Sequence, residues 1–480
     1  MAFDAVAVLV MALFAFYINR NVRVSGLYMD DLYLWSCYGE QSFKEFVFPA
    51  GSTRFRPVFW MAAYVELAAI GTKLNLIVPI NLIILTLITA YCYFFMVRLS
   101  KSRCLSFVAS IAIIASTFSY YDVSQLLGLL ESLSMFFALL MCIKLFIYKE
   151  EKKEVNYILA VISYLLVCFT HERYMVLIPM FYYVLIVMKD RKKLNYMLPA
   201  IVLIFVILSR YAVTGTLLPA GTGGTKVEET FTLMGFWSSI KCEIKYLLGF
   251  NAGPEYLCGL EWQYVSRYVK AMVYMGICLL TALAVMFLIR LYTCIRKKGA
   301  VVYALFDEIY FAGFIIGCVA ASSVTIRVEM RWIYTSFVFL LFIIAYAYGF
   351  IRKYSCGRTS KAALICAVTL CVLFISENIY YRGYWGRIYL FPNQERYNSL
   401  ADVTYGKYGE EIFGKDIYII GNSYEMSEFT GETFFKIFDP DRNAEGTHVY
   451  HVDDVTEIPM EDNVIILRED PENNAFAEVR

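Results

Sequence analysis

Long runs of apolar residues alternate with short polar connections along most of this chain. Eleven of these runs approach the length that a helix needs to cross the about 30 Å of hydrocarbon in a bilayer. The pattern therefore predicts a mainly α, polytopic membrane protein. We expect spanning helices at about 3–19, 74–97, 104–120, 125–148, 155–170, 174–188, 195–213, 270–292, 302–324, 332–351 and 361–379.

Lysines and arginines are concentrated in alternate connections. The short connections on one side carry 18 of them, and those on the other side carry three, Arg173, Arg327 and Arg331. Positive residues favour the cytoplasmic side, so the N-terminus is predicted to be cytoplasmic. The outer loops 20–73 and 214–269, and the chain after residue 379, are then predicted to lie outside.

One apolar run, 57–70, is short and contains Glu66. If it crossed the membrane, every later connection would change sides and the charge asymmetry would invert. We therefore expect an interfacial helix in the first outer loop.

The chain divides at about residue 379. Residues 1–379 form the predicted transmembrane module. In 380–480 the strand-like runs 416–421, 447–452 and 463–469 surround a helical stretch, which predicts a small extracytoplasmic α/β domain.

Composition and charge support this division. The chain is 59% hydrophobic and only 18% charged, which is far from soluble composition. Residues 380–480 hold 9 Lys and Arg against 20 Asp and Glu, whereas the rest holds 34 against 22. No basic stripe accompanies a base-reading motif, so nucleic acid is not expected as a partner.

Thirteen cysteines give no disulfide framework, because most lie within apolar runs, where cysteine behaves as a small hydrophobe. A pair between Cys242 and Cys258 is the one alternative. The first apolar run lacks a basic segment before it and a small-residue cleavage site, so we expect a retained anchor.

The first acidic pair, Asp30-Asp31, stands in the stretch YMDDLYLW, just after the first predicted helix. Asp30 would cap a following helix, and both charges would favour its N-terminal end. Alternatively, mutual repulsion near a low-dielectric surface raises the pKa of each carboxyl, as a general base requires. The sequence leaves both interpretations open.

Further charged residues are predicted on the same outer side. Arg54 and Arg56 precede the interfacial run; phosphate binding and snorkelling toward lipid headgroups are the alternatives. Asp122 and Glu131 would contact either substrate or internal hydrogen-bond partners, with Glu131 facing the interior of the bundle.

Two short outer turns add to this set. His171, Glu172 and Arg173 form one, which water alone would explain unless the turn belongs to a site built from several loops. Arg327 and Arg331 flank Glu329 in the other, where a phosphate or a salt bridge with Glu329 would compensate them.

Other motifs carry less chemistry. The glycines in 214–269 lack the spacing of a phosphate-binding loop, so this loop is either a flap at a lipid portal or a linker. His448 and His451 would point to opposite faces of a strand. We therefore expect no metal site there and no resident cofactor, with a divalent cation as the alternative.

These features together resemble the GT-C glycosyltransferases, membrane enzymes that take a sugar from a polyprenyl-phosphate carrier. The resemblance lies in Asp30-Asp31 in the first outer loop, Arg56-Pro57 at the start of a juxtamembrane helix, the turn His171-Glu172-Arg173, and the order of elements. It covers nearly the whole chain as architecture, although its motifs are short.

The resemblance implies that Asp30 is the catalytic base and that Asp31 supports it. It implies phosphate binding by cations, for which Arg331 and Arg327 come first and then His171 and Arg173. The implied reaction is an inverting hexosyl or pentosyl transfer from a polyprenyl-phosphate sugar to a hydroxyl of a cell-surface glycan or glycolipid. The richness in Lys, Ile and Tyr favours a bacterial plasma membrane, with the endoplasmic reticulum as the alternative.

Two other classes remain open. A lipid-linked oligosaccharide flippase or transporter would show internal repeats and charge at the membrane midplane. A polysaccharide polymerase of the O-antigen type would have its active region in 214–269 and would leave Asp30 unimportant.

Overall fold

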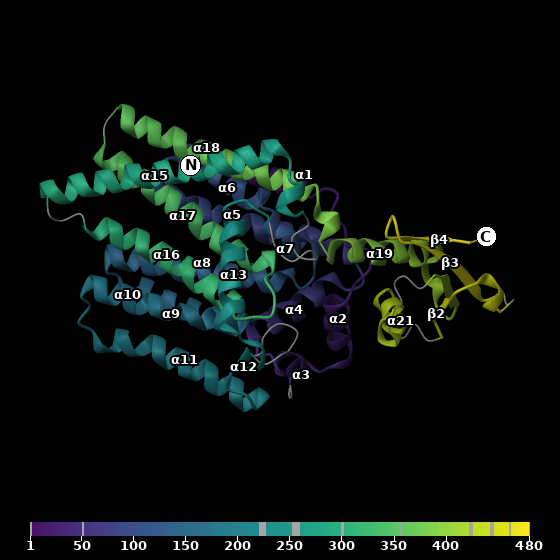
Figure 1. Cartoon of the computed structure of the whole chain (residues 1–480). Coiled ribbons are helices and arrows are strands. Elements are labelled where there is room, and N and C mark those ends of the chain that lie inside the picture. The colour runs from purple at the N-terminus through teal and green to yellow at the C-terminus, as the bar shows by residue number, and fades with distance from the viewer. Residues whose placement is uncertain are drawn as a thin grey trace.

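A computed structural model describes residues 2–49, 52–219, 227–251, 260–298, 302–355, 357–388, 390–421, 426–441, 446–459 and 462–479. The protein is mainly helical, with one small sheet near the C-terminus (Figure 1). Seven of the described helices are long and apolar enough to cross a membrane. They are α5 (Ile77–Ser100, preceded by a 3-10 turn at Leu74–Leu76), α8 (Gly128–Glu151), α11 (Lys193–Thr214), α15 (Arg267–Lys298), α16 (Val302–Ser323), α17 (Met330–Tyr354) and α18 (Arg358–Arg382).

The remaining predicted spans are also helical but shorter. They are α1 (Ala2–Ile18), α6 (Arg103–Ala115), α9 (Glu154–Thr170) and α10 (Pro179–Met188), the last preceded by a 3-10 helix at Glu172–Leu177. Several helices are thus long and apolar enough to span a membrane, as expected for an integral membrane protein. The count of eleven spans stays a prediction.

The predicted continuous helix over 104–120 is wrong. Helix α6 ends at Ala115, Ser116 caps a 3-10 turn at Thr117–Ser119, and α7 (Tyr120–Ser124) follows. The segment Thr117–Ser124 is bent by 47° from α6. The segment 121–124, expected as a simple outer connection, is a buried part of α7. If α6 and α7 form one bent span, the candidates number eight.

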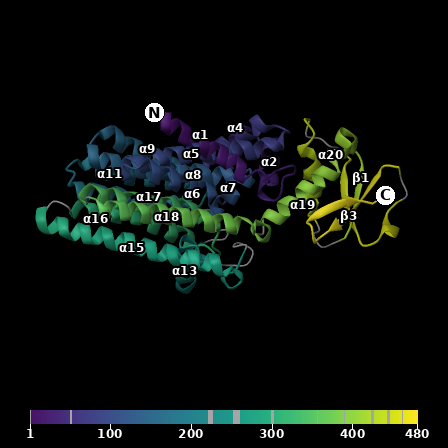
Figure 2. The same cartoon turned by 90° about the horizontal axis from the view of Figure 1, so that it is seen from above.

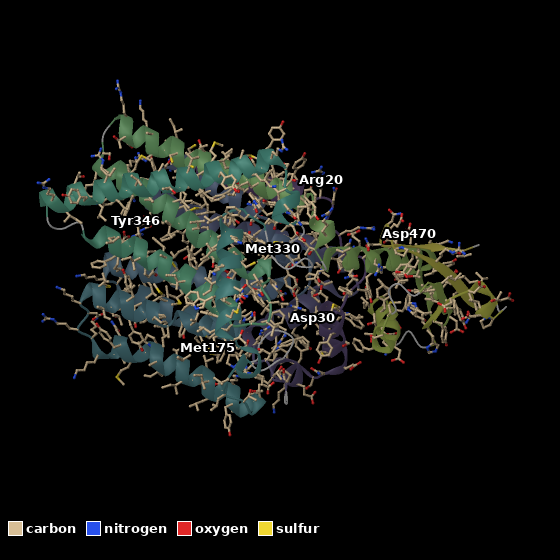
Figure 3. All side chains as sticks on the ribbon, viewed as in Figure 1. Arg20, Asp30, Met175, Met330, Tyr346 and Asp470 are labelled. Atoms are coloured by element: carbon tan, nitrogen blue, oxygen red, sulfur yellow. The ribbon has the colours of Figure 1, made fainter. Side chains whose placement is uncertain are left out.

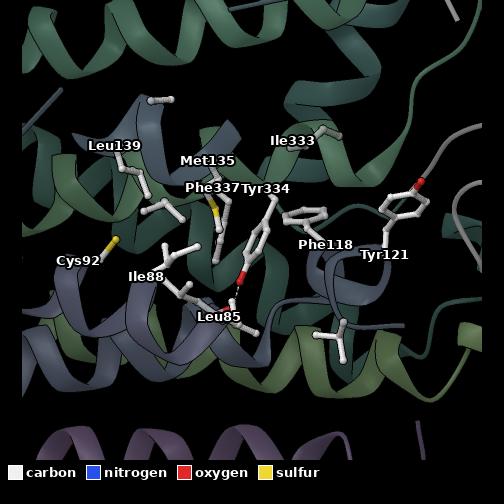
Figure 4. Close-up of a cluster of buried hydrophobic side chains, with 14 of the residues drawn as sticks. Leu85, Ile88, Cys92, Phe118, Tyr121, Met135, Leu139, Ile333, Tyr334 and Phe337 are labelled. Atoms are coloured by element: carbon white, nitrogen blue, oxygen red, sulfur yellow. Dashed lines mark hydrogen bonds between the residues drawn. The ribbon is translucent and has the colours of Figure 1, made fainter. Parts of the chain in front are cut away.

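The long helices pack side by side around α17 (Figures 1 and 2). Figure 4 shows apolar side chains from α5, α8 and α17 meeting around Tyr334. The Tyr334 hydroxyl donates to the carbonyl of Ile113 at 2.8 Å, close to where α6 ends. This carbonyl also accepts from the backbone N–H of Ser116 at 3.2 Å, so the end of α6 is held both by its own cap and by a side chain of α17.

The loop after α1 forms three helices, α2 (Asp30–Glu40), α3 (Phe43–Val47) and α4 (Pro57–Ile70). Pro57 occupies the first turn of α4, where its missing N–H and fixed φ suit a helix start. The helix expected at 57–70 is thus confirmed, and its place in the membrane interface stays a prediction. The loop after α11 forms α12 (Val227–Thr230) and α13 (Leu233–Leu247).

The C-terminal region is a four-stranded sheet of order β2-β1-β3-β4. The first three strands are parallel and β4 is antiparallel to β3, which makes the sheet mixed. The three predicted strands are confirmed, whereas β4 and the long helix α19 were not expected. The elements are α19 (Leu390–Val403), α20 (Tyr405–Tyr408), β1 (Asp416–Ile420), α21 (Glu428–Phe434), β2 (His448–Val452), β3 (Val464–Asp470) and β4 (Ala475–Glu478).

This C-terminal region contacts the segment between α1 and α2. The side chain of Gln394 donates to the carbonyl of Gly26 at 2.7 Å, and the backbone N–H of Ser25 donates to Asn398 Oδ1 at 2.7 Å. Arg23 pairs with Asp402 at 2.6 Å on the surface. Helix α19 therefore holds the segment that leads into Asp30.

Candidate functional site

A cavity of about 320 Å³ lies where α2, the loop before α4, the 3-10 helix after α9 and the α16–α17 connection meet. Most of the charged residues that the sequence predicts for the site line this cavity, although they are far apart in the chain. They are Asp30, Arg54, Arg56, His171, Glu172, Arg173, Arg327 and Arg331, and Glu131 joins them.

The acidic pair occupies the first turn of α2, on the side of the helix bundle that faces the C-terminal sheet (Figure 3). Asp30 was expected as a possible helix cap, but the cap position is Met29, which has a φ of 44° and makes no side-chain capping hydrogen bond. Asp30 is exposed to the cavity, and its carboxylate makes no hydrogen bond to another described residue.

Asp31 has the opposite environment, with only 1% of its surface exposed. Its carboxylate accepts hydrogen bonds from the backbone N–H groups of Leu126 and Leu127, both at 2.8 Å. Burial raises the pKa of Asp31 to about 7 despite these hydrogen bonds. Asp31 thus joins α2 to the connection before α8, and Asp30 is the member of the pair that lines the cavity.

Glu172 is the centre of a buried charge network rather than a free ligand group. Its two oxygens accept from the N–H of Phe55 at 2.8 Å, from Arg210 at 3.0 Å and from Arg56 at 2.9 Å. Burial alone would raise the pKa of Glu172, but Arg56 and these hydrogen bonds hold it below its usual range. Glu172 and Arg56 thus pair with each other while they line the cavity, and their expected substrate-binding role stays a prediction.

Arg210 completes this network and was not selected from the sequence. Its side chain is 1% exposed and also donates to the carbonyl of Thr53 at 2.7 Å. Its position in the sequence could have indicated this role, because an arginine inside an apolar helical run is unfavourable unless it faces the interior and has partners.

Arg173 pairs with Glu131 inside the bundle, where its guanidinium also lies 5.0 Å from the centroid of the Tyr174 ring. Burial would lower the pKa of Arg173, but the Glu131 carboxylate outweighs it and raises that pKa. The Nη1 group of Arg173 and the indole Nε1 of Trp332 are buried and have no hydrogen-bond partner among the described residues. Both residues line the cavity, so it presents donors ready for an anion.

Glu329 organises the other two arginines. It accepts from Arg327 Nε at 2.8 Å and pairs with Arg331. The guanidinium of Arg331 stacks 3.9 Å from the centroid of the Tyr121 ring. The salt-bridge alternative is thus present, and both arginines still line the cavity.

The local environment lowers the pKa of two further cavity residues, Arg54 and His171. Arg54 makes no side-chain hydrogen bond or ion pair with another described residue, and the positive charge of Arg56, with partial burial, lowers its pKa. Burial and the nearby arginines lower the pKa of His171 well below its usual value, so the ring is neutral. Because His171 Nδ1 accepts from the N–H of Arg173 at 3.4 Å, its proton belongs on Nε2.

Asp122 is not brought to this cavity. It is 1% exposed and accepts from the hydroxyl of Ser132 at 3.2 Å. The sequence left the same two alternatives open for Asp122 and Glu131, substrate contact or internal hydrogen bonding. Of these two residues, Glu131 lines the cavity, from the buried face of α8. The proposed Cys242–Cys258 pair involves Cys258, which lies outside the described residues.

A second, smaller cavity of about 90 Å³ adjoins the first. It shares Asp30, Tyr121, Arg327 and Arg331 with the larger cavity. Its other walls include Tyr28, Tyr120, Gln125, Ile388 and Leu390, the last two from the connection to the C-terminal sheet. Asp30 therefore stands between two compartments.

The charge balance of the larger cavity favours an anion. Five arginines and a neutral histidine face three carboxylates, and two of these carboxylates are held in ion pairs with arginine. Leu127, Leu130, Val324 and Trp332 add an apolar wall. Within the described ranges, no group of three His, Cys, Asp or Glu residues is arranged to hold a metal. The site combines one unpaired carboxylate, several cationic donors and an apolar surface.

No protein-family model matches the chain, and no curated protein matches it.

Proposed function

We propose that the protein is an inverting GT-C type glycosyltransferase that moves a sugar from a polyprenyl-phosphate carrier to an acceptor hydroxyl. The observation that carries the proposal is the position of Asp30. Its unpaired carboxylate stands between an arginine-lined cavity and a tyrosine-lined cavity. A base that takes a proton from one substrate while the other substrate reacts needs this position.

The arginine-lined cavity is assigned to the lipid-linked donor. The phosphate would contact Arg54, Arg173 Nη1 and Trp332 Nε1, whose donors are free of other partners in the described stretches of the chain. Guanidinium groups suit phosphate because they donate in a planar fork. The apolar wall that includes Leu127, Leu130 and Val324 would contact the first isoprene units.

The tyrosine-lined cavity is assigned to the acceptor. Tyr28, Tyr120 and Gln125 supply apolar rings and hydrogen-bonding groups of the kind that a glycan or glycolipid headgroup requires.

The reaction follows from these assignments. Asp30 accepts the proton of the acceptor hydroxyl, and the oxygen attacks the anomeric carbon of the donor sugar. The bond between that carbon and the phosphate oxygen breaks, and its electron pair leaves with the lipid phosphate. One displacement inverts the anomeric configuration. The arginines stabilise the charge that develops on the departing phosphate, which is a preorganised electrostatic contribution.

The proposal includes a placement in the cell. Eleven spans, a cytoplasmic N-terminus and an extracytoplasmic sheet would put Asp30 on the outer side of a bacterial plasma membrane. The charge asymmetry of the connections supports this placement.

Asp30→Asn tests the proposal in the purified full chain with a polyprenyl-phosphate sugar and a glycan acceptor. We expect kcat to fall by about 10²–10⁴-fold, the usual contribution of a general base, with donor binding retained. Glu40→Gln is the matched control, because Glu40 is exposed at the other end of α2 and lines neither cavity. Undiminished transfer by a folded Asp30→Asn variant refutes the assignment.

A further inference from the structure

A third cavity lies away from the proposed reaction site, between α18, the segment after α13 and the 3-10 turn that follows α6. Its volume of about 10 Å³ suits one water-sized particle. Glu377, Asn251, Gly249, Tyr246 and Thr117 are among the residues that line it.

Glu377 brings a carboxylate into this cavity without a partner. The residue is 1% exposed, and neither Oε1 nor Oε2 has a hydrogen-bond partner among the described residues. An ionised carboxylate that is buried and uncompensated is among the most unfavourable features of a folded protein. The residue therefore requires a proton, a water or a cation.

Asn251 adds a second acceptor to the same cavity. It is 4% exposed, and its Nδ2 donates to the carbonyl of Leu260 at 3.1 Å, whereas its Oδ1 has no hydrogen-bond partner within the described ranges. Two nearby donors are directed elsewhere. The Tyr381 hydroxyl donates to the carbonyl of Gly249 at 2.7 Å, and Asn378 Nδ2 donates to the carbonyl of Phe374 at 2.7 Å.

Gly249 allows the backbone to approach the carboxylate closely. Its φ is +89°, and a Cβ at this position would lie 2.5 Å from Glu377 Oε2. A glycine is thus required both for the backbone conformation and for the space beside the carboxylate.

We infer that Glu377 and Asn251 bind a small monovalent cation, Na⁺, in this cavity. Hard cations take oxygen ligands, and the two carboxylate oxygens of Glu377 and Oδ1 of Asn251 have no hydrogen-bond partner among the described residues. A single positive charge neutralises the one carboxylate, whereas a divalent ion would leave an uncompensated charge in an apolar surrounding. Na⁺ is smaller than a water molecule, so it fits a cavity of this volume. The cation would tie α18 to the segment after α13, independently of the transfer reaction.

The test is the thermal unfolding of the purified full chain in detergent, at constant ionic strength, with choline chloride replaced stepwise by NaCl or KCl. We expect Na⁺ to raise Tm in a saturable manner by on the order of 2 °C or more, with a smaller effect of K⁺. Glu377→Gln should remove the difference between Na⁺ and choline. Glu40→Gln, which removes an exposed carboxylate, should keep it.

A second variant keeps the test open if Glu377→Gln does not fold. Asn251→Asp adds a second carboxylate to the cavity, so Ca²⁺ at millimolar concentration should raise its Tm more than it raises that of the wild type. The inference is overturned if Na⁺ and choline give the same Tm in the wild type, which would mean a protonated Glu377 or a bound water. It is also overturned if Ca²⁺ exceeds Na⁺ in the wild type, or if a folded Glu377→Gln variant keeps the Na⁺ response.

Discussion

Asp30 and Asp31 are neighbours in the chain, and their environments differ completely. Asp31 is buried and accepts from two backbone N–H groups, whereas Asp30 is exposed between two cavities. Because successive residues of a helix point about 100° apart, an adjacent pair divides between core and cavity. One carboxylate positions the helix that presents the other.

The raised pKa of Asp31 predicts a pH dependence of stability. Its pKa rises from 3.8 to about 7 on folding, so the native state binds more protons than the unfolded state between these values. The stabilising contribution is therefore complete below about 3.8 and is lost as the pH rises through about 7. Asp31→Asn, which does not titrate, should unfold with a weaker pH dependence in this window when denaturation is followed by circular dichroism.

Asp31→Asn should also be less stable overall, because an amide oxygen and an amide NH₂ cannot both accept from the two N–H groups. The expected loss is about 1–3 kcal/mol, the cost of one unsatisfied buried group. An unchanged pH slope would contradict the assignment of this titration to Asp31.

Arg210 gives a second prediction at this scale. Arg210→Met leaves Glu172 without one of its cationic partners and frees the carbonyl of Thr53. Breaking a buried ion pair from one side typically costs about 3–5 kcal/mol, so Tm should fall clearly. Arg20→Met, at an exposed arginine, should change stability by no more than about 0.5 kcal/mol. Equal Tm values for the two variants would show that the network is not structural.

Among the elements, α13 stands out because it runs across the direction of the long helices (Figure 1). Leu233, Trp237 and Ile244 are 65%, 53% and 46% exposed on one side, whereas Glu243 is fully buried on another. The Ser322 hydroxyl donates to Glu243 at 2.7 Å, and Ser322 also lines the larger cavity. An apolar exposed side on a helix that is fixed at the bundle is typical of a membrane-interface helix.

We therefore expect the apolar side of α13 to contact lipid. In vesicles, a fluorophore at Ile244→Cys should be quenched by brominated lipid, and one at Ser238→Cys, on the neighbouring exposed side, should be quenched by iodide in water. Aqueous quenching of both positions would place α13 outside the interface.

At the scale of the whole molecule, the C-terminal sheet and the helix bundle meet at the segment before α2. Gly26 lies in this contact, where an added Cβ would be 2.6 Å from the carbonyl oxygen of Tyr397 and 2.9 Å from the ring of Phe434. The segment continues directly into Tyr28 and Asp30, which line the smaller cavity. A disturbance of the contact should therefore reach the proposed reaction site.

Gly26→Ala should weaken this contact. We expect faster proteolytic release of the C-terminal region and at least about a tenfold lower transfer rate, because small misplacements of catalytic groups reduce rates strongly. Gly386→Ala is the matched control, since a Cβ there meets no atom within 4 Å. If both variants retain full activity, the sheet does not influence Asp30.

The sequence indicated most of the elements and the side on which charged residues collect. Apolar runs correspond to the long helices, and alternating residues in the tail correspond to three strands, because periodicity depends on local backbone geometry. Prediction from the sequence failed where contacts between distant residues decide the secondary structure. Ser116 interrupts an apolar run that predicts one continuous helix. Strand β4 has only four residues, too few to predict a strand from its sequence, and it forms by pairing with β3 at the edge of the sheet.

By itself, the sequence determined that this is a helical protein with membrane-spanning character, an acidic α/β end and a set of carboxylates and arginines in the connections between its helices. These features follow from whether each segment is more stable in water or in a bilayer, and that preference depends on the segment's own composition. Only the tertiary structure decided which charges pair and which stay available. Glu172 became a buried partner of Arg56 and Arg210, Asp122 turned inward, and Asp30 remained open to two cavities. Ion pairing in a low-dielectric interior depends on distances between residues far apart in the chain, and these distances exist only in the folded protein.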